Sequence, residues 1–229
     1  MFINPRLLMS EIKELHRKGV EVDTGNFGVA ATAHVTLDYH IHEDQAAFQQ
    51  ERHTSTGNGN MQTAVDKYGR RGIRFIEFLE PELMKECLLR RFPEGMPPRY
   101  EGTEAFVNSY AAEREFLQEF VVQEHDIRKN HGQHYYIAEG AQGFFLDVDA
   151  GQYPGVTSSN SGKVPSGLDT VLGVVKLYTS SVGMGDRPFV SQIDAPLEDQ
   201  LREDWKEYGS TTGKKRSLGW FDAVATRYA

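Results

Sequence analysis

The sequence predicts an α/β protein, in which strands that end in polar loops alternate with amphipathic helices. The clearest strand is the apolar, aromatic run 135–138, which breaks at Gly140 into side chains that carry amides, hydroxyls and carboxylates. A second run of strand-forming residues covers 174–179. In open α/β sheets ligands bind beyond the carboxyl ends of the strands, so residues 139–160 are the first candidate for a binding site.

The composition narrows the class of protein. The chain has 229 residues, of which 39% are apolar, and this is enough for a sizeable core. Its formal net charge of -8, from 33 acidic and 25 basic residues, argues against a nucleic-acid partner. Cys87 is the only cysteine, which excludes an internal disulfide framework and fits a reducing compartment. No apolar run is long enough for a membrane span and no signal peptide is visible, so we expect a cytoplasmic protein without a membrane partner.

The first 50 residues are expected to form structural scaffold. Asn4 and Pro5 precede regularly spaced leucines and isoleucines that end at Gly19, and this pattern predicts an amphipathic helix with an asparagine cap. Short strands are expected at 20–22 and 33–37.

Residues 38–42 contain two imidazoles, His40 and His42, that would point to the same side of a strand. Together with Asp38 or His34 they form a candidate zinc site. A zinc site needs three or four ligands in fixed geometry, and the sequence adds only scattered partners at His125, His131 and His134. We therefore prefer an interpretation without a metal.

A glycine-rich loop at 55–60 leads into a helical pattern at 61–71 that Gly72 closes. The free amides and the positive dipole end of such a helix start suit a phosphate, although such a loop is more often only a turn that caps the helix. Arg70 and Arg71 can bind phosphate with their guanidinium forks, or compensate the carboxyl end of the helix dipole.

Further helices are expected in the rest of the chain. Their positions are from Pro81 to the break at Phe92, over 103–122, around 168–173 and around 198–207. The aromatic residues that recur at helical spacing within 103–122 are typical of packing. We see no boundary between domains, and we expect one domain segment over 1–229.

Residues 209–222 form a second candidate site. Hydroxyls and glycines flank three successive cations, Lys214, Lys215 and Arg216, in an otherwise acidic chain. Flexible backbone that approaches closely, together with positive charge, predicts a loop that binds carboxylate or phosphate. The alternative is a solvated run of charges.

Several of these stretches resemble the adenylosuccinate synthetase family. Residues 139–160 match its Glu-Gly-Ala-Gln-Gly, Asp-x-Asp-x-Gly-x-Tyr-Pro and Val-Thr-Ser-Ser-Asn motifs, and 66–72 match Asp-Lys-x-x-Arg-Arg-Gly. Residues 171–185 match its Val-Leu-Gly-Val-Val-Lys strand and the loop after it, and 211–220 match Thr-Thr-Gly-Arg-x-Arg-x-x-Gly-Trp. The resemblance implies an α/β fold with a mostly parallel central sheet and surrounding helices, of which this chain holds the central part.

The family ligates IMP and L-aspartate to adenylosuccinate in purine biosynthesis, using GTP and Mg²⁺ and releasing GDP and phosphate. The resemblance implies a homodimer in which Arg70 reaches across the interface to the partner's substrate. It implies that IMP is bound by Thr56, Arg70, Gln142, Thr157 and Lys214. The implied aspartate-binding loop consists of Thr211, Thr212, Gly213, Lys214, Lys215 and Arg216. Arg216 would also stabilise the GTP phosphates.

Parts of the family pattern have no match. The opening Gly-Asp-Glu-Gly-Lys-Gly-Lys loop supplies the catalytic base and a Mg²⁺ ligand, and the Asn-Ala-Gly-His-Thr motif supplies the acid; neither occurs here, nor does the later Thr-Lys-Leu-Asp segment. We therefore expect no catalytic residue and no metal ligand in this chain. The sheet would lack its first strands, so we also expect an unpaired edge and poor stability for the isolated chain.

Three interpretations remain open. The chain can be a fragment, or one product of a split gene, of an adenylosuccinate synthetase. It can be a relative of the phage enzyme that acts on dGMP, because Asn58, Ser181 and Lys214 stand where the family has arginine. It can also be a nucleotide-binding remnant without catalysis.

Overall fold

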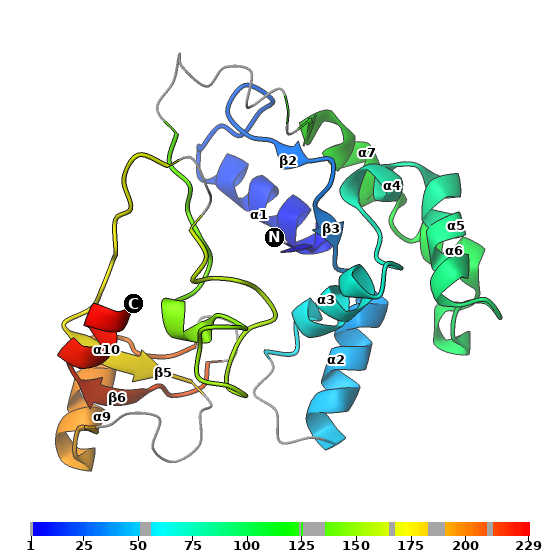
Figure 1. The fold of residues 1–229 in the computed structure, drawn as a ribbon. Coiled ribbons are helices and arrows are strands. Elements are labelled where there is room, and N and C mark those ends of the chain that lie inside the picture. Colours follow the sequence, from blue (N-terminus) through cyan, green and yellow to red (C-terminus); the bar gives the residue numbers. More distant parts are fainter. Residues whose placement is uncertain are drawn as a thin grey trace. The chain divides into compact units, whose positions relative to one another are not determined.

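The computed structural model describes residues 2–50, 56–123, 125, 136–164, 168–182, 191–209 and 213–229 (Figure 1). Their contacts divide the chain into two compact units. Unit 1 consists of Met1–Ala47 and Gly57–Ile137, and unit 2 of Phe48–Thr56 and Ala138–Ala229. The single domain segment expected over 1–229 stays a prediction.

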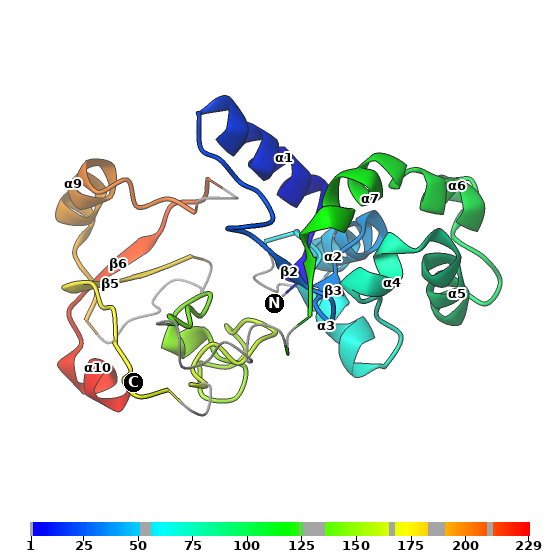
Figure 2. The ribbon, with the colours of Figure 1, turned by 90° about the horizontal axis from the view of Figure 1, so that it is seen from above.

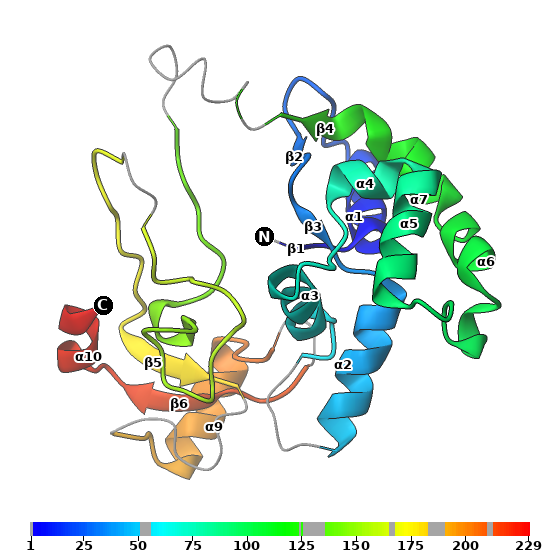
Figure 3. The same ribbon diagram turned by 45° about the vertical axis from the view of Figure 1, so that its right-hand side comes forward.

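The chain combines helices with short, mostly parallel strand pairs, so the predicted α/β class is confirmed. Within the described ranges the strands form three two-stranded sheets. Two of the sheets are parallel and belong to unit 1: β1 (Phe2–Ile3) with β3 (His34–Val35), and β2 (Val29–Ala30) with β4 (Val121–Val122) (Figure 3). The third is antiparallel and lies in unit 2: β5 (Tyr178–Ser181) with β6 (Ser217–Trp220).

The first helix, α1 (Pro5–Arg17), confirms the capping pattern read from the sequence. The Asn4 side chain accepts hydrogen bonds from the backbone N–H groups of Arg6 at 3.1 Å and Leu7 at 3.2 Å. Gly19 follows the helix with φ of 79°, the left-handed conformation that favours glycine. The strand expected at 20–22 is absent, and the one expected at 33–37 is reduced to β3.

Six further helices form unit 1 among its described residues. They are α2 (Asp38–Gln50), α3 (Asn60–Tyr68), α4 (Phe75–Leu79), α5 (Pro81–Arg91), α6 (Thr103–Asn108) and α7 (Ala111–Leu117). In Figure 2, α1 lies against α7, while α4, α5 and α6 pack in succession. Buried aromatic rings join these helices: the ring of Tyr110 lies 5.8 Å from Phe78 and 5.4 Å from Phe106, both edge to face.

The single helix predicted over 103–122 is wrong in its continuity. It is divided between α6 and α7, and a 3-10 turn (Gln118–Phe120) and β4 follow. At the break, the Ser109 hydroxyl donates back to the Phe106 carbonyl at 2.8 Å, a local bond that competes with the helix. Tyr110 then turns into the core, where its hydroxyl accepts the Asp38 N–H at 2.9 Å.

Unit 2 has far less buried apolar surface. Of its described residues, only Ile193 and Leu218 are buried hydrophobics. The β5–β6 pair lies beside α9 (Ala195–Asp204), the helix expected around 198–207, and α10 (Ala223–Tyr228) follows β6. No described helix of either unit has the length and apolar character of a membrane span.

Two predicted elements of unit 2 and its border are absent. Residues 136–138 form no strand, and Ile137 is 95% exposed; Tyr135, the first residue of that prediction, lies outside the described residues. The helix predicted around 168–173 is not present in 168–173, and the strand predicted at 174–179 begins only at Tyr178. The described residues offer these apolar segments no neighbouring strand, so no β-ladder forms there.

Candidate functional site

The loop before α3 is held against α2 by hydrogen bonds from and to its backbone. Gly59 caps α3 with φ of 78°, and its N–H donates to Asp44 Oδ2 at 2.9 Å. A Cβ at Gly59 would lie 2.9 Å from both Ile41 N and Thr36 Cγ2, so only glycine fits. The Thr63 hydroxyl donates to the Gly59 carbonyl at 2.9 Å, which completes the turn. Thr56, the predicted nucleotide ligand, lies at the start of this loop and is exposed.

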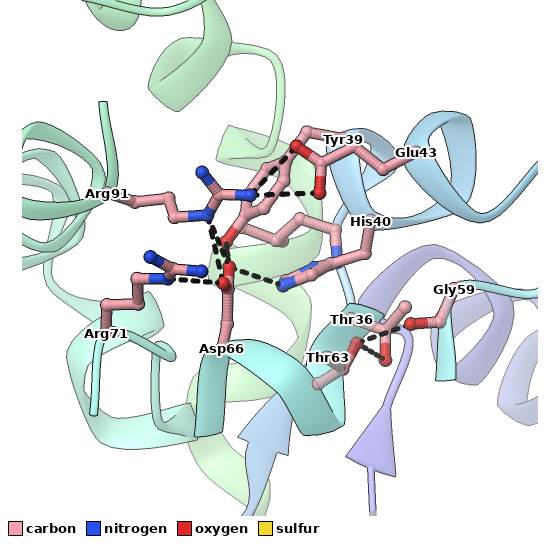
Figure 4. Close-up of polar contacts among 10 residues, drawn as sticks. Thr36, Tyr39, His40, Glu43, Gly59, Thr63, Asp66, Arg71 and Arg91 are labelled. Atoms are coloured by element: carbon pink, nitrogen blue, oxygen red, sulfur yellow. Dashed lines mark hydrogen bonds and ion pairs between the residues drawn. The ribbon is translucent and has the colours of Figure 1, made fainter. Parts of the chain in front are cut away.

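The carboxylate of Asp66, on α3, is the centre of a buried polar cluster in unit 1 (Figure 4). Asp66 is 1% exposed. Its Oδ1 accepts from Arg71 Nε and from Arg91 Nε, both at 2.9 Å. Its Oδ2 accepts from the Tyr39 hydroxyl at 3.3 Å. Arg91 also donates to both oxygens of Glu43, at 3.0 and 3.1 Å, so two guanidinium groups and two carboxylates neutralise one another.

The electrostatics of Asp66 follow from these contacts. Burial alone would raise the pKa of its carboxyl group, but His40, Arg71 and the charge of Arg91 outweigh burial and lower the pKa to about 2. The Leu37 N–H donates to His40 Nδ1 at 2.9 Å, so the ring proton sits on Nε2, which lies 3.4 Å from Asp66 Oδ2.

The zinc hypothesis loses its geometric basis, because 38–42 begin helix α2 and not a strand. Side chains two residues apart on a helix point in different directions. His40 is buried against Asp66, while His42 Nδ1 lies 2.7 Å from the Tyr100 hydroxyl. The described part of the chain contains no group of three or more His, Cys, Asp or Glu residues that could hold a metal ion.

The neighbouring residues Arg70 and Arg71 are both exposed, but they differ in their partners. Arg71 pairs with Asp66, so it takes the structural role that the sequence left open for both. Arg70 has φ of 58°, a left-handed conformation that is unusual outside glycine, and it is exposed. Its side chain makes no hydrogen bond or ion pair with another described residue.

Arg70 lines a hollow of about 210 Å³ in unit 1 that is strongly basic. The lining residues are His34, Lys67, Arg70, Gly72, Arg74, Glu77 and Arg90. Glu77 is the only acidic residue among them, and it pairs with Arg74 at 2.9 Å. Burial and the charge of Lys67 lower the pKa of His34, as expected beside cations. The hollow is suited to an anion.

In unit 2, the loop 139–162 is built on the carboxylate of Asp147. Asp147 is buried and accepts the N–H groups of Asp149 at 2.8 Å, Ala150 at 2.9 Å and Gly162 at 2.8 Å. These backbone hydrogen bonds lower the pKa of its carboxyl group. Gly151 passes so close that a Cβ there would lie 2.4 Å from the Asp147 carbonyl oxygen. The Asp147 carboxylate therefore closes the loop by accepting three backbone N–H groups.

The loop places Gln142 and Thr157, the two residues predicted to hold the purine nucleotide. Thr157 is half-buried, and its N–H donates to the Leu146 carbonyl at 2.7 Å. Gln142 is exposed and has φ of 74°. Neither side chain hydrogen-bonds to a described residue. Asn160, in the same motif as Thr157, donates to Asp149 Oδ2 at 2.8 Å and stabilises the loop.

In unit 2, the loop that carries Lys214 and Lys215 is closed at its base by the ion pair between Glu207 and Arg216. Arg216 donates through Nη1 to Glu207 Oε2 at 3.1 Å, and its N–H donates to the Glu207 carbonyl at 3.1 Å. Between them the Gly209 N–H donates to the Lys214 carbonyl at 2.8 Å. Gly213, Lys214 and Lys215 are exposed beyond this base. Thr211 and Thr212, two further predicted residues of the loop, lie outside the described residues.

Glu207 is the acceptor that holds this base together. It is 4% exposed and also accepts from Lys176 Nζ and from the Tyr178 hydroxyl. Burial would raise the pKa of Glu207, but the hydrogen bonds from Lys176 and Tyr178 and the charges of Lys176 and Arg216 lower it. Burial and the bond to Glu207 raise the pKa of Tyr178 to about 12. Arg216 is thus held by a fixed negative charge.

Sequence reasoning missed the three carboxylates that organise these sites: Asp66, Asp147 and Glu207. Asp66 and Asp147 stand inside quoted motifs, so their position was visible but their burial was not. Glu207 falls at the end of the helix expected around 198–207, but it follows α9 and is buried. The available signal for Asp66 and Asp147 is their fixed place in recognisable motifs, and the sequence offers no comparable signal for Glu207.

Comparison with known proteins identifies the family. The family model described as adenylosuccinate synthetase matches residues 1–229. The chain is 36% identical to the adenylosuccinate synthetase of Synechococcus elongatus over 255 aligned positions, which cover 99% of this chain and 55% of the relative. It is also 36% identical to that of Listeria monocytogenes over 253 positions, covering 100% of this chain and 57% of the relative.

A solved structure shows the same fold. The fully ligated adenylosuccinate synthetase from Plasmodium falciparum superimposes with a TM-score of 0.80 at 27% sequence identity, covering 97% of this chain and 55% of that chain. The chain thus spans about half the length of the relatives that it matches. Because the match runs through all of its residues, this chain belongs to the adenylosuccinate synthetase family.

Proposed function

We propose that this chain forms the substrate-holding part of a ligase that joins IMP and L-aspartate with the use of GTP. The observation that supports the proposal most is the family match at 36% identity across 99–100% of the chain, through both candidate sites. The single buried cysteine fits a reducing compartment, so we place the protein in the cytoplasm.

The nucleotide monophosphate is assigned to the polar side chains that the resemblance implies. Gln142 and Thr157 offer an amide and a hydroxyl that no described residue uses, and Thr56 offers a second hydroxyl. Arg70 offers a guanidinium beside other cations, which suits the phosphate of IMP. In the proposed homodimer Arg70 acts on the substrate that the partner subunit holds. This assignment gives a reason for its exposed, left-handed position.

The loop 211–216 is assigned to the carboxylates of L-aspartate. Lys214 adds a charge near the IMP site, and Lys215 adds another beside it. Arg216 is assigned to the GTP phosphates, because its guanidinium is already held by Glu207 and loses little conformational freedom when it binds. The resemblance assigns a Mg²⁺ ligand to a family motif that has no match in this sequence, so no metal step is assigned to this chain.

The chemistry supplied by these residues is positioning and charge neutralisation. In a reaction of this type the purine 6-oxygen takes the γ-phosphoryl group, and the aspartate amine then displaces phosphate. Arg70 and Arg216 would neutralise phosphate charge, while Gln142 and Thr157 orient the nucleotide. The acid and the base are expected from family motifs that this sequence lacks.

Activity tests the proposal directly. Phosphate release is measured with GTP, IMP and L-aspartate, on the chain alone and together with the amino-terminal part of the Synechococcus elongatus relative. We expect release only in the mixture. No release in either preparation, with IMP still bound, would leave the remnant interpretation standing.

A second substrate is tested in the same assay. Asn58, Ser181 and Lys214 replace arginines of the family pattern, which favours a changed purine or sugar as the alternative. Replacing IMP by dGMP, and GTP by ATP, gives four combinations. Faster release with dGMP than with IMP would assign the chain to the phage-type reaction.

Binding tests the residue assignments independently of turnover. IMP affinity is measured by calorimetry for the wild-type chain and for Arg70→Ala, Gln142→Ala and Thr157→Ala. The loss of a charge-assisted bond to phosphate should weaken binding about tenfold or more. Glu104→Ala, which removes an exposed ion pair with Lys85, is the control and should leave the affinity unchanged.

A further inference from the structure

The position of Arg70 is strained, and the strain needs a cause. Its φ of 58° lies in the left-handed region, where a side chain is unfavourable and glycine is the usual choice at the end of a helix. Gly69, the residue before it, is right-handed with φ of −72°. The sequence therefore places arginine, and not its glycine neighbour, at the strained position. Strain of this kind persists where surrounding contacts enforce it.

Asp66 supplies those contacts on the main chain. Its carbonyl oxygen accepts the N–H of Arg71 at 2.9 Å and the N–H of Gly72 at 3.0 Å. Arg70 itself donates its N–H to the Lys67 carbonyl at 3.1 Å. Both amides that follow Arg70 thus return to one residue of α3, and this closes the turn around the arginine.

The side chain of Asp66 binds one of the two adjacent guanidinium groups. Arg71 Nε reaches Asp66 Oδ1 at 2.9 Å, so the half-exposed side chain of Arg71 is tied to a buried carboxylate (Figure 4). The Cβ of a larger residue at Gly72 would lie 2.8 Å from the His34 ring, which blocks the turn from shifting by one residue. With Arg71 tied to Asp66 and the backbone left-handed at Arg70, the Arg70 side chain has no partner among the described residues.

Asp66 is also saturated, which prevents Arg70 from pairing with it. Arg91 donates to both carboxylate oxygens, at 2.9 and 3.0 Å, and the Tyr39 hydroxyl reaches Oδ2. Arg91 is fixed in turn by Glu43. The nearest buried carboxylate therefore has no acceptor to spare, and Arg70 keeps its charge for an external anion.

We propose that Asp66 is a positioning residue for Arg70: its carbonyl and its saturated carboxylate hold the 69–72 turn so that Arg70 presents an unpaired guanidinium. The proposal rests on the proposed role of Arg70 in binding the phosphate of IMP. Asp66 touches no substrate in this assignment, and its effect on binding passes entirely through the conformation of Arg70.

The test uses Asp66→Asn, with Glu113→Gln as the matched control. Glu113 is also a buried carboxylate of unit 1 that faces an arginine, Arg6, but it lies on α7, away from the turn. Arg70 is observed in isotope-labelled chain by its ¹³C shifts and its ³J(HN–Hα) coupling, which report φ. IMP affinity is measured on the same samples by calorimetry, in both the wild-type and the Arg70→Ala background.

In Asp66→Asn we expect Arg70 to leave the left-handed region and IMP affinity to fall about tenfold. In the Arg70→Ala background the same change should cost less than about twofold, because the two residues act as one unit. Glu113→Gln should move neither readout. A folded Asp66→Asn chain that keeps Arg70 left-handed would overturn the proposal. So would a double variant in which the losses of IMP affinity from the two single changes multiply.

Two provisions keep the result decisive. If Asp66→Asn does not fold, Arg71→Gln replaces it, since this change removes one of the two donors to Asp66 Oδ1 while Arg91 still holds the carboxylate; we expect Arg70 to turn toward Asp66, and an unchanged Arg70 would count against the proposal. If the wild-type chain does not bind IMP, the proposed function fails. The conformation of Arg70 in the variants then decides the inference alone.

Discussion

At the scale of single residues, two adjacent arginines show how one turn separates structure from function. The Asp-Lys-x-x-Arg-Arg-Gly motif contains two equal side chains, and only the backbone conformation tells them apart. Arg71 is tied to Asp66, whereas Arg70 is exposed beside Lys67 and Arg74 in a basic hollow. Of the two arginines, Arg70, the proposed phosphate ligand, is thus the one with the strained backbone conformation. Its side chain makes no hydrogen bond or ion pair with another described residue.

This contrast predicts opposite effects of the same substitution at neighbouring positions. Arg70→Gly should raise the free energy of unfolding by about 0.5–1 kcal/mol, because glycine accepts the left-handed conformation and a repelling cation is removed. Arg71→Gly should lower it by about 1–3 kcal/mol, because Asp66 loses a charged partner. Urea denaturation followed by circular dichroism measures both. Equal destabilisation by the two changes would contradict the geometry of this turn.

The Asp66 cluster predicts acid sensitivity in a defined range. Its folded pKa of about 2 lies below the value of about 3.9 of an unfolded aspartate, so the carboxylate contributes stability above about pH 4 and loses it as the pH falls toward 2. The contribution is about 1–2 kcal/mol. The difference in unfolding free energy between wild type and Asp66→Asn should therefore shrink from pH 6 to pH 2.5. A difference that stays constant would show that the charge of Asp66 is not stabilising.

The sequence allowed the site residues to be named but not their environments. Gln142, Thr157, Arg70 and Arg216 were selected because motifs identify residue types at fixed spacing. Whether a polar group is left for a ligand depends on distant partners, and these follow only from the fold. Asn160 illustrates the limit, since the same motif that contains Thr157 places its amide on Asp149.

At the scale of elements, the loop 139–162 combines a predicted ligand site with an unpredicted framework. Its ligand candidates lie on a backbone held by Asp147, by the Thr157 to Leu146 bond and by a bond of 3.1 Å from Val148 N–H to the Ser159 carbonyl. The loop is therefore expected to behave as one unit, in which the contacts of Asp147 position the proposed ligand residues Gln142 and Thr157.

The framework can be tested at one atom. Gly151→Ala places a Cβ 2.4 Å from the carbonyl oxygens of Asp147 and Phe145, which the loop can relieve only by opening. We expect the free energy of unfolding to fall by about 1–3 kcal/mol. Faster hydrogen exchange of the Thr157 and Val148 amides should accompany it. Gly143→Ala is the control in the same loop, because a Cβ there meets nothing within 4 Å. Equal exchange in the two variants would show that the loop is not closed at Gly151.

Local signals predicted some elements well and others poorly. The helix α1 follows from its asparagine cap, proline start and glycine stop, all of which act within a few residues. The strands expected at 135–138 and 174–179 depend on neighbours that local composition does not supply. Among the described residues no strand lies beside these segments, so 136–137 and 171–177 form no strand and are exposed.

At the scale of the whole chain, the two units differ in how much apolar surface they bury. Unit 1 contains a continuous core of aliphatic and aromatic side chains from its helices and short strands. Unit 2 is held mainly by hydrogen bonds and by ion pairs such as that of Glu207 with Arg216. Since apolar burial is the dominant stabilising term in folding, the two units are expected to differ in stability.

Native-state hydrogen exchange should reveal this difference. The amides of Val35 and Phe75, bonded within unit 1, should exchange at least about tenfold more slowly than those of the β5–β6 pair. Addition of the amino-terminal part of a relative should slow exchange in 171–177, because a strand partner then becomes available. Uniform protection across both units, with one cooperative unfolding transition, would instead support the single domain segment expected from the sequence.

The exposed segment 171–177 has a consequence for handling the protein at high concentration. Val174 is 100% exposed and Leu172 and Leu177 are each 86% exposed, in a run of β-forming residues without proline. Runs of this kind template the stacking of identical chains into cross-β fibrils. Lys176 is the only charge in the segment, and its ammonium is bound to Glu207. This lysine acts as a gatekeeper, and its ion pair couples the solubility of the chain to the same carboxylate that fixes Arg216.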